Sequence, residues 1–445
     1  MKKEYVKPGI VKVGSPLYAK HGSAKQSYQQ IRKEIDGNVI GDLVQKHGSP
    51  LFVFSENNLR KKYREAYSAM KKNYPDVTFG WSYKTNYLNG ICKVFHEEGA
   101  IAEVVSHFEY EKARALGVPG NKIIYNGPYK HMAGLRQAIV EGAQIHVDNF
   151  YEIEDIEKIA KELNIVVKIG MRLNLNCGIY PLWSRFGFNL EIGQAPAAMT
   201  RIHKSPNLKL TGVHTHIGTF ILDINAYSEA VKKLSSFIRE IEATLGYNIE
   251  FLDLGGGFAS LSHLKGIYQP PEIVVPNVEQ YAEAIGKELK WLAARSTPPK
   301  LYMELGRHLV DEAGYLITQV VCDKLLPDGR RSYVLDAGVN LLYTSTWYKY
   351  KIELDREVKG IMETSILNGP LCMNIDIVDE AILLPRLERY QNIILSPVGA
   401  YNVTQWMQFI QYRPAVVMIK EDKSVKVLRR AEQLDDLNRM EEDLN

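Results

Sequence analysis

The stretch VTFGWSYK, residues 77–84, decides the fold, because it is an apolar, β-rich run that stops at a polar residue and is the first of eight such runs. The last of them contains LYME, residues 301–304, and ends at Glu304. Most of the runs are continuously apolar rather than alternating, which is typical of strands buried on both faces. The eight runs cover residues 77–83, 101–105, 122–125, 144–147, 166–173, 209–216, 250–254 and 300–304.

The segments between these runs have helical spacing. After Asp148, a predicted N-cap, Ile153, Ile156 and Ala160 recur at intervals of three and four residues, with charged residues between them. Strands that alternate with helices in this way form a parallel sheet with right-handed crossovers, and eight units predict a closed (β/α)8 TIM barrel. In such barrels the chemistry lies on the rim where the strands end. The residues predicted there are Lys84, Ser106, Asn126, Asp148, Arg172, His216, Gly255 and Glu304.

The 445-residue chain is longer than one barrel of about 250 residues, so a second unit is expected. Apolar runs such as YLITQVV, RSYVLDA, EAILL, NIILS and AVVMIK predict an antiparallel β domain after the barrel. We assign residues 46–310 to the barrel, and residues 1–45 together with 311–445 to the β domain. The charged end of the chain, RRAEQLDDLNRMEEDLN, is predicted to be a solvated helix or a frayed tail.

Composition excludes several classes of protein. The formal net charge is only +3 and no long basic run is present, so neither nucleic acid nor an anionic membrane is indicated as a partner. The start, MKKEYVKPGIVKVG, lacks the apolar segment of a signal peptide, and no stretch of about 18 apolar residues occurs. The four cysteines lie far apart without a C-x-x-C pair, which argues against a disulfide scaffold or a zinc site. We therefore expect a cytoplasmic enzyme that acts on a small molecule.

Three features of the predicted rim point to a phosphorylated aldehyde cofactor. Lys84 lies at a strand end, where desolvation would lower its pKa and make the amine a nucleophile. Gly255, Gly256 and Gly257 follow a strand and can cradle a phosphate with backbone N–H groups. Arg307 adds a fixed cation. Pyridoxal 5'-phosphate fits this set, with Lys84 as its Schiff-base partner. Taken singly, the lysine could also cap a strand at the surface, and the glycines could form a tight turn.

Glu304 and two histidines complete the predicted rim. A carboxylate beside the pyridine nitrogen keeps it protonated and so favours loss of CO2. The alternative for Glu304 is an ion pair with Arg307, one helical turn away. His216 is expected to stack on a cofactor ring, and His214, two residues before it on the same strand, to be a hydrogen-bonded core residue. We expect no metal site, because partners for an H-x-H pair are missing from the other strand ends.

These residues resemble the motifs of the fold-type III pyridoxal-phosphate decarboxylases, a family that acts on diaminopimelate, ornithine and arginine. The resemblance implies a barrel like that of alanine racemase. The resemblance covers roughly residues 45–415, with the motifs in family order, and is closest to the diaminopimelate decarboxylases. SYKTN resembles Y-x-x-K-A-N, which implies that Lys84 is the Schiff-base lysine. HTHIGTF resembles H-x-G-S, which implies that His216 stacks on the ring and Thr219 contacts the phosphate. Arg172 matches the barrel arginine of the family, and Glu103 stands where aspartate is usual.

Motifs after the barrel imply a site shared between two chains. NGPLCMNID resembles G-P-x-C-x-x-x-D, which implies that Cys372 crosses a dimer interface and protonates the substrate carbon after CO2 has left. On its own, Cys372 is one of four scattered cysteines and would be read as inert. GAY, residues 399–401, implies that Tyr401 helps to hold the cofactor. The resemblance thus implies a head-to-tail homodimer with two shared active sites.

The departures from the family lie at substrate positions. Thr344 stands where diaminopimelate decarboxylases carry an arginine, whereas Tyr348 matches. Met373 follows the cysteine, where those enzymes have glutamate and ornithine decarboxylases have aspartate. Without these charges, a distal ammonium or carboxylate would be left unpaired at a cost of about 2–5 kcal/mol. We therefore expect a less charged, modified or carrier-tethered amino acid, with substrate contacts from Arg307, Thr344, Tyr348, Met373 and Tyr401.

The predicted function is pyridoxal-phosphate-dependent decarboxylation of an amino acid, and four alternatives stay open. One is a true diaminopimelate decarboxylase. Another is an amino-acid racemase on the same scaffold, against which Glu304 argues because racemases of this type place an arginine at the ring nitrogen. The third is a lysine-dependent aldolase without cofactor, and the fourth is a catalytically inactive protein that regulates a decarboxylase.

Overall fold

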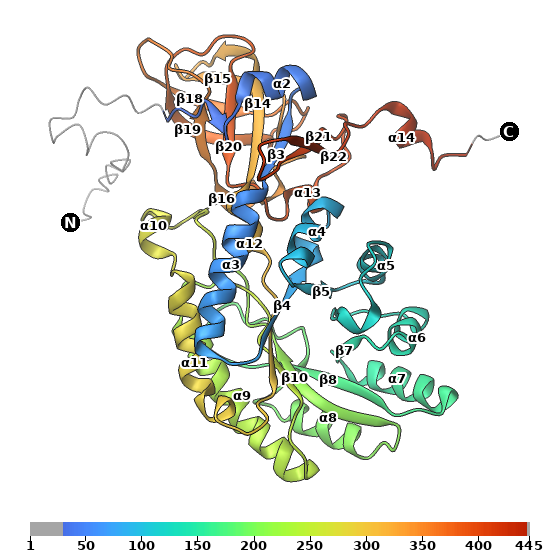
Figure 1. The fold of residues 1–445 in the computed structure, drawn as a ribbon. Helices are drawn as coiled ribbons and strands as arrows, with labels where there is room; N and C mark the ends of the chain where they lie inside the picture. Colours follow the sequence, from blue (N-terminus) through green and yellow to red (C-terminus); the bar gives the residue numbers. More distant parts are fainter. Residues whose placement is uncertain (1–29, 443–445) are drawn as a thin grey trace, which may run out of the picture.

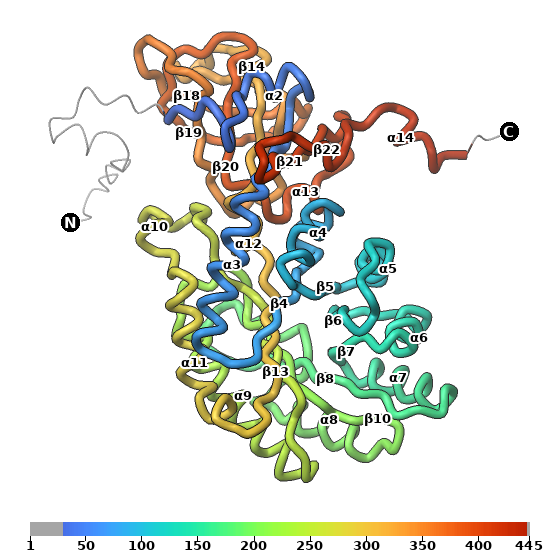
Figure 2. Tube along the Cα trace, in the orientation of Figure 1, coloured from blue at the N-terminus to red at the C-terminus, as the bar shows by residue number. Residues whose placement is uncertain are grey.

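The computed structural model describes residues 30–442, which form a barrel and a β domain (Figure 1). Figure 2 follows the chain from the β domain (blue) through helix α3 (Glu56–Asn73) into the barrel (cyan to yellow) and back to the β domain (orange to red). Segments from both ends of the described chain therefore build the β domain. The start of the sequence, to which the prediction of a missing signal peptide applies, lies outside the described residues.

The predicted (β/α)8 barrel is confirmed. Eight parallel strands follow one another around a closed sheet, and β10 pairs with β8 to close it. Each strand coincides with one of the apolar runs of the sequence to within two residues at either end. The strands are β4 (Val77–Ser82), β5 (Ile101–Val104), β6 (Ile123–Tyr125), β7 (Gln144–Val147), β8 (Val167–Asn174), β10 (Leu208–Thr215), β11 (Phe251–Asp253) and β13 (Lys300–Met303).

Two facing glycines make room at the closure. Gly170 of β8 pairs with Gly212 of β10. A Cβ atom on Gly212 would lie 2.5 Å from the ring of Phe251, and one on Gly170 would lie 2.7 Å from the same ring. Real Cβ atoms do not approach other atoms so closely, so the Phe251 ring fits beside the β8–β10 pair only because both positions lack a side chain.

Helices on the outside of the barrel cover its strands with apolar stripes. In α7 the predicted residues Ile153, Ile156 and Ala160 are buried. The N-cap is one residue later than predicted, because the Asn149 side chain, not that of Asp148, accepts the Glu152 N–H. The Asp148 carboxylate instead faces Arg172. The barrel helices that follow α3 are α4 (Asn89–Glu97), α5 (His107–Ala115), α6 (Met132–Val140), α7 (Phe150–Leu163), α8 (Gln194–His203), α9 (Asn225–Leu245) and α11 (Val278–Ala293).

The β domain has a mostly antiparallel sheet with two parallel pairings. Its strands run in the order β19-β18-β15-β14-β3-β21-β22, and β20 pairs with β14 and β17. The parallel pairs are β15 with β18 and β3 with β21. The strands are β3 (Leu51–Ser55), β14 (Gly314–Leu325), β15 (Arg331–Leu335), β17 (Lys351–Leu354), β18 (Glu363–Asn368), β19 (Ile377–Leu384), β20 (Asn392–Ser396), β21 (Ala415–Ile419) and β22 (Val425–Arg429).

Strand β3 alters the division of the chain that we predict. Residues 51–55 fall within the predicted barrel segment 46–310, but they pair with β14 and β21 in the second sheet. We therefore propose that the barrel unit begins at α3.

The smaller elements are β1 (Glu34–Ile35), β2 (Asn38–Val39), α2 (Ile40–His47), β9 (Phe188–Asn189), β12 (His263–Leu264), α10 (Pro271–Val274), α12 (Arg307–Val310), β16 (Tyr348–Lys349), α13 (Asn402–Gln405), α14 (Leu434–Asn438) and the 3-10 helices η1 (Tyr83–Thr85), η2 (Gly120–Lys122), η3 (Asp311–Ala313) and η4 (Tyr343–Thr346).

Hydrogen bonds tie the β domain to the barrel next to Lys84. Thr404 Oγ1 donates to the Lys84 carbonyl at 3.0 Å, and the Tyr401 N–H donates to the Thr85 carbonyl at 2.9 Å. Asn86 Nδ2 donates to the Gly399 carbonyl at 3.1 Å. The segment that enters α13 is therefore held at a fixed place relative to the end of β4. Within residues 30–442, no helix has the length and apolar character needed to cross a membrane.

The glycine pair at the closure leads to a prediction for stability. Gly212→Ala should lower the free energy of unfolding by about 1–3 kcal/mol, because the new methyl group must displace the Phe251 ring. Urea denaturation measures this difference. Gly41→Ala in α2 is the control, since a Cβ atom there meets nothing within 4 Å, and it should change stability by no more than about 1 kcal/mol. Equal effects of the two substitutions would contradict the close approach at the closure.

Candidate active site

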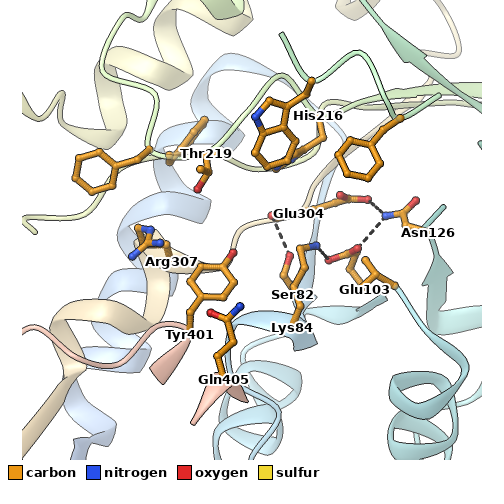
Figure 3. Close-up of a pocket in the computed structure, with 18 of the residues that line it drawn as sticks. Ser82, Lys84, Glu103, Asn126, His216, Thr219, Glu304, Arg307, Tyr401 and Gln405 are labelled. Atoms are coloured by element: carbon orange, nitrogen blue, oxygen red, sulfur yellow. Dashed lines mark hydrogen bonds and ion pairs between the residues drawn. The ribbon is translucent and has the colours of Figure 1, made fainter. Parts of the chain in front are cut away.

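A cavity of about 580 Å³ opens at the carboxyl ends of the barrel strands, between the barrel and the β domain. It is the place predicted for chemistry in such a barrel. Figure 3 shows residues from both units directed into it. The predicted site residues that line it are Lys84, Arg172, His216, Thr219, Gly257, Glu304, Arg307, Thr344, Tyr348 and Tyr401.

Four other predicted residues do not line this cavity. Gly255 and Gly256 lie directly behind it, and the Gly256 N–H donates to His216 Nδ1 at 3.0 Å. Cys372 and Met373 lie on the loop between β18 and β19, and the Cys372 side chain is exposed. Within one chain, therefore, neither of these two residues contacts the cavity.

Lys84 forms an ion pair inside the cavity. Its Nζ lies 2.7 Å from Glu103 Oε2 (Figure 3). Burial alone would lower the pKa of Lys84, but the carboxylates of Glu103 and Glu304 outweigh it, so the pKa is raised. This corrects the predicted lowering, which counted desolvation and omitted the neighbouring carboxylates. The structure therefore holds the amine in its charged form, and Glu103 is the residue that stabilises this charge.

Glu304 accepts a hydrogen bond from a side chain shared with Glu103. Asn126 Nδ2 donates to Glu304 Oε1 at 2.5 Å and to Glu103 Oε1 at 3.0 Å. The alternative ion pair between Glu304 and Arg307 does not form, because the Arg307 guanidinium pairs with Asp311 at 3.5 Å. Asn126 thus connects the carboxylate beside Lys84 with the carboxylate predicted to face the cofactor nitrogen.

A chain of donors orients Asn126. Gln144 Nε2 lies 2.9 Å from His146 Nε2, and His146 Nδ1 lies 2.7 Å from Asn126 Oδ1. If Gln144 donates, His146 carries its proton on Nδ1 and donates to Asn126. Burial lowers the pKa of His146 well below its usual value, so the ring is neutral. It can therefore accept a hydrogen bond on Nε2 and donate one from Nδ1. The chain of donors therefore ends on the two carboxylates of the cavity floor.

His214 differs from its predicted role as a hydrogen-bonded core residue, since neither ring nitrogen has a hydrogen-bond partner among the described residues. Burial lowers its pKa well below the usual value, so its 3.5 Å approach to Glu304 is not an ion pair. Ligand atoms of His146, His214 and Glu304 lie within 4.8 Å of one another. One member of the H-x-H pair, His214, therefore does have such neighbours, contrary to the argument from sequence, although His216 is not among them and both nitrogens of His146 are already hydrogen-bonded.

Asp253, at the end of β11, lies beneath this floor and is fully buried. Burial, followed by the charge of Glu304, raises the pKa of Asp253 well above its usual value. Its carboxyl group is therefore neutral.

His216 is placed to contact a ring. Burial, then the charges of Lys84 and Arg172, lowers its pKa to about 3, so the imidazole is neutral. Its Nδ1 accepts the Gly256 N–H, and its ring centroid lies 5.2 Å from that of Trp183. A flat, neutral imidazole held in this way is suited to stacking on an aromatic cofactor.

The residues present fit pyridoxal phosphate. Gly257 has φ +102°, and a Cβ atom there would lie 2.5 Å from the Gly218 carbonyl, so the turn requires glycine. Gly257 also lines the cavity, where its backbone can meet a ligand. Arg307 Nε is buried and has no hydrogen-bond partner among residues 30–442, which is unusual for a guanidinium group and suits a phosphate oxygen. Lys84 supplies the amine that a carbonyl group needs.

Thr344 contributes no free polar group to the cavity. Its N–H and Oγ1 both donate to Asn402 Oδ1, at 3.1 and 3.0 Å, and its Oγ1 lies 3.0 Å from the hydroxyl of Tyr350. Asn402 Nδ2 donates in turn to the Val398 carbonyl. The four groups form a buried cluster that closes one wall of the cavity without any charge.

Several cavity residues have no role in the predicted site. Asn126 was predicted at the rim without a function, and Glu103, next to the end of β5, could be found by the same signal. Trp183, Phe186 and Trp347 come from loops, and Gln405 comes from α13 in the β domain. No sequence pattern marks loop residues as lining a barrel, because their positions depend on how the two units pack.

Comparisons with known proteins agree with this geometry. Residues 60–311 match the family model of the pyridoxal-dependent decarboxylases, pyridoxal binding domain. Diaminopimelate decarboxylases of Aquifex aeolicus and Bacillus methanolicus are each 29% identical, over 90% and 92% of this chain and 93% and 96% of theirs. The crystal structure of the diaminopimelate decarboxylase from M. jannaschii superposes with a TM-score of 0.84 at 27% identity, over 93% of this chain and 98% of that one.

The Lys84–Glu103 pair leads to a prediction about pH. In Glu103→Gln, the pKa of Lys84 should fall. Burial lowers this pKa, and the variant lacks the carboxylate of Glu103, which together with that of Glu304 raises it. Capture of pyridoxal phosphate by the cofactor-free protein requires the uncharged amine, so its pH profile should shift to lower pH. Stopped-flow absorbance measures the capture rate. Glu111→Gln, at an exposed glutamate on the neighbouring helix α5, should leave the profile unchanged. Identical profiles for the two variants would refute the role given to Glu103.

Proposed function

The chain belongs to the pyridoxal-dependent decarboxylases, and we propose that it removes CO2 from an amino acid whose distal group carries no charge. It is thus a pyridoxal-phosphate-dependent amino-acid decarboxylase. The observation that carries the finer proposal is the uncharged wall around Thr344, where hydrogen bonds within the protein already use the polar groups. A charged distal group would find no counter-charge there.

Pyridoxal phosphate, when bound, supplies a ring that withdraws electrons from the substrate's α-carbon and so allows CO2 to leave. We propose that Lys84 binds its carbonyl carbon. The ring would lie against His216, and its phosphate would be held by the 255–257 turn, Thr219, Arg307 and Tyr401. Arg172, paired with Asp148 at 3.4 Å, would lie on the same rim.

Glu304 favours decarboxylation over racemisation. A carboxylate next to the pyridine nitrogen holds a proton on it, because the positive nitrogen and the negative carboxylate stabilise each other. Asp253 is held neutral by its burial and cannot take this role. The racemase alternative requires an arginine next to the pyridine nitrogen, whereas this cavity has Glu304 at that position. Release of CO2 without inversion of the substrate would distinguish the two activities.

We propose that the active site is completed by a second copy of the chain. The loop that carries Cys372 is held by Asp376, whose two carboxylate oxygens accept the N–H groups of Val339 and Leu371 at 2.7 and 2.8 Å. It presents Cys372 and the 67% exposed Ile375 to the outside. Cys372 of the partner subunit would return the proton to the α-carbon, and the partner's Met373 would contact the substrate. A head-to-tail homodimer follows from this arrangement.

A second candidate substrate is meso-diaminopimelate, because relatives with that activity in their names are 26–29% identical over most of the chain. Thr344 and Met373 speak against it. The ammonium group and the carboxylate at the distal end of meso-diaminopimelate would both lack a charged partner, which we expect to cost about 2–5 kcal/mol of binding free energy.

A substrate panel tests the proposal. The holoenzyme should release CO2 faster from amino acids with neutral distal groups, free or bound to a carrier protein, than from meso-diaminopimelate, ornithine or lysine. The difference in kcat/KM should be about 30-fold or more, as expected for an unpaired distal charge. A holoenzyme that prefers meso-diaminopimelate would show that the reading of Thr344 and Met373 is wrong.

Mixed dimers test the shared site. Lys84→Ala chains and Cys372→Ala chains should each be inactive alone, and their mixture should regain up to about a quarter of wild-type activity, because half of the dimers are hybrids with one intact site. The control mixture combines Lys84→Ala with the double variant Lys84→Ala/Cys372→Ala and should stay inactive. If the first mixture also stays inactive although hybrid dimers are detected, the two residues do not act in one site across the interface.

A further inference from the structure

The charged side chains that line the cavity already have partners within the protein. Lys84 pairs with Glu103 at 2.7 Å, and Arg172 with Asp148 at 3.4 Å. Arg307 pairs with Asp311, and its free Nε is assigned to the cofactor phosphate. Glu304 accepts from Asn126 and is assigned to the cofactor nitrogen. No charged group of the described residues is left over to bind the distal end of a substrate.

Several neutral polar side chains in the cavity have no such assignment, among them Trp347, Tyr348 and Gln405, and Gln405 is the one that offers a carboxamide. Gln405, the last residue of α13, lines the cavity and is exposed. Its carboxamide has no hydrogen-bond partner in the part of the chain that the structure describes. Figure 3 shows this carboxamide directed into the cavity, on the side from which Lys84 and Tyr401 enter. The group is thus available to a ligand.

The position of Gln405 is fixed relative to the reactive amine. Its neighbour Thr404 donates to the Lys84 carbonyl, and the Tyr401 N–H donates to the Thr85 carbonyl. Aromatic rings line the same cavity, among them Phe220, Trp347 and Tyr348. Such rings can attract a cation, but the Arg307 guanidinium already lies 5.8 and 4.6 Å from the centroids of Phe220 and Tyr348. In a cavity without a free counter-charge, a carboxamide recognises a neutral polar group better than a charge.

We propose that Gln405 determines specificity by hydrogen bonding to a distal carbonyl of the substrate, and that the substrate is an amino acid with a distal carboxamide, free or substituted on its nitrogen. The proposal rests on the proposed function. A carboxamide carries both a donor and an acceptor, so the two amides can pair in both directions. A thioester offers the same carbonyl acceptor but no donor, so it would form one hydrogen bond in place of two.

Two substitutions test this inference. Gln405→Met keeps the length of the side chain and removes its donor and acceptor, whereas Gln405→Glu keeps the shape and adds a negative charge. Gln408→Met is the matched control, because Gln408 lies on the same segment, donates to the Gln411 carbonyl and does not line the cavity. The substrates are amino acids with a terminal carboxamide, the same with an N-alkyl group, the thioester analogue, and an unbranched apolar amino acid of equal length.

Gln405→Met should raise KM for the carboxamides roughly 2- to 10-fold, the loss expected for neutral hydrogen bonds, and leave KM for the apolar amino acid unchanged. Gln405→Glu should lower kcat/KM for the carboxamides and raise it for ornithine or lysine. The thioester should show a smaller rise in KM than the carboxamides. Calorimetry with the amine product of the carboxamide substrate should show the same loss of affinity in Gln405→Met without any turnover.

The outcomes separate this inference from the proposed function. If the unmodified holoenzyme prefers meso-diaminopimelate, ornithine or lysine, the proposed function fails. If it prefers neutral substrates but Gln405→Met and Gln408→Met behave alike in both KM and product affinity, only the role of Gln405 is overturned. A uniform rise in KM for polar and apolar substrates in Gln405→Met also overturns it, because that result indicates a structural effect.

Discussion

Closure of the barrel between β8 and β10 is the constraint on which the site depends. The two strands pair along most of their length, with Gly170 opposite Gly212, and the Phe251 ring occupies the space that two side chains would fill. The same register sets Arg172 beside His214. Once the sheet is closed, eight strand ends face one opening, and residues more than 200 positions apart, such as Ser82 and Glu304, come within hydrogen-bonding distance.

Burial makes several titratable groups at the floor of the cavity neutral. Asp253, His146 and His214 are all made neutral, because a charge at these depths would lack solvation. Two carboxylates keep their roles as acceptors since Asn126 donates to both. Lys84 stays charged because the carboxylates of Glu103 and Glu304 outweigh the effect of burial on its pKa. The polarity of the site is therefore concentrated on a few atoms that face the opening.

Much of the fold could be predicted, because buried parallel strands leave continuous apolar runs and polar residues at their ends. Strand β3 could not be assigned in this way, since its run LFVFS looks the same whether it joins a barrel or a second sheet. Lys84 was found as a site residue, but its pKa was predicted in the wrong direction, because the effect of Glu103 depends on a distance between two strands. Gln405 was missed because its place follows from domain packing alone.

The hydrogen bonds between residues 84–86 and 399–404 have a consequence for how such an enzyme can change over time. They attach the wall formed by α13 and η4 to the backbone that carries the reactive lysine. Side chains on that wall that take no part in these bonds, such as Gln405, can be exchanged without moving the amine or the phosphate cradle. New substrates can then be acquired by point mutation, while the chemical step is inherited unchanged. The joint between the two units is in this sense the place where the family can diversify.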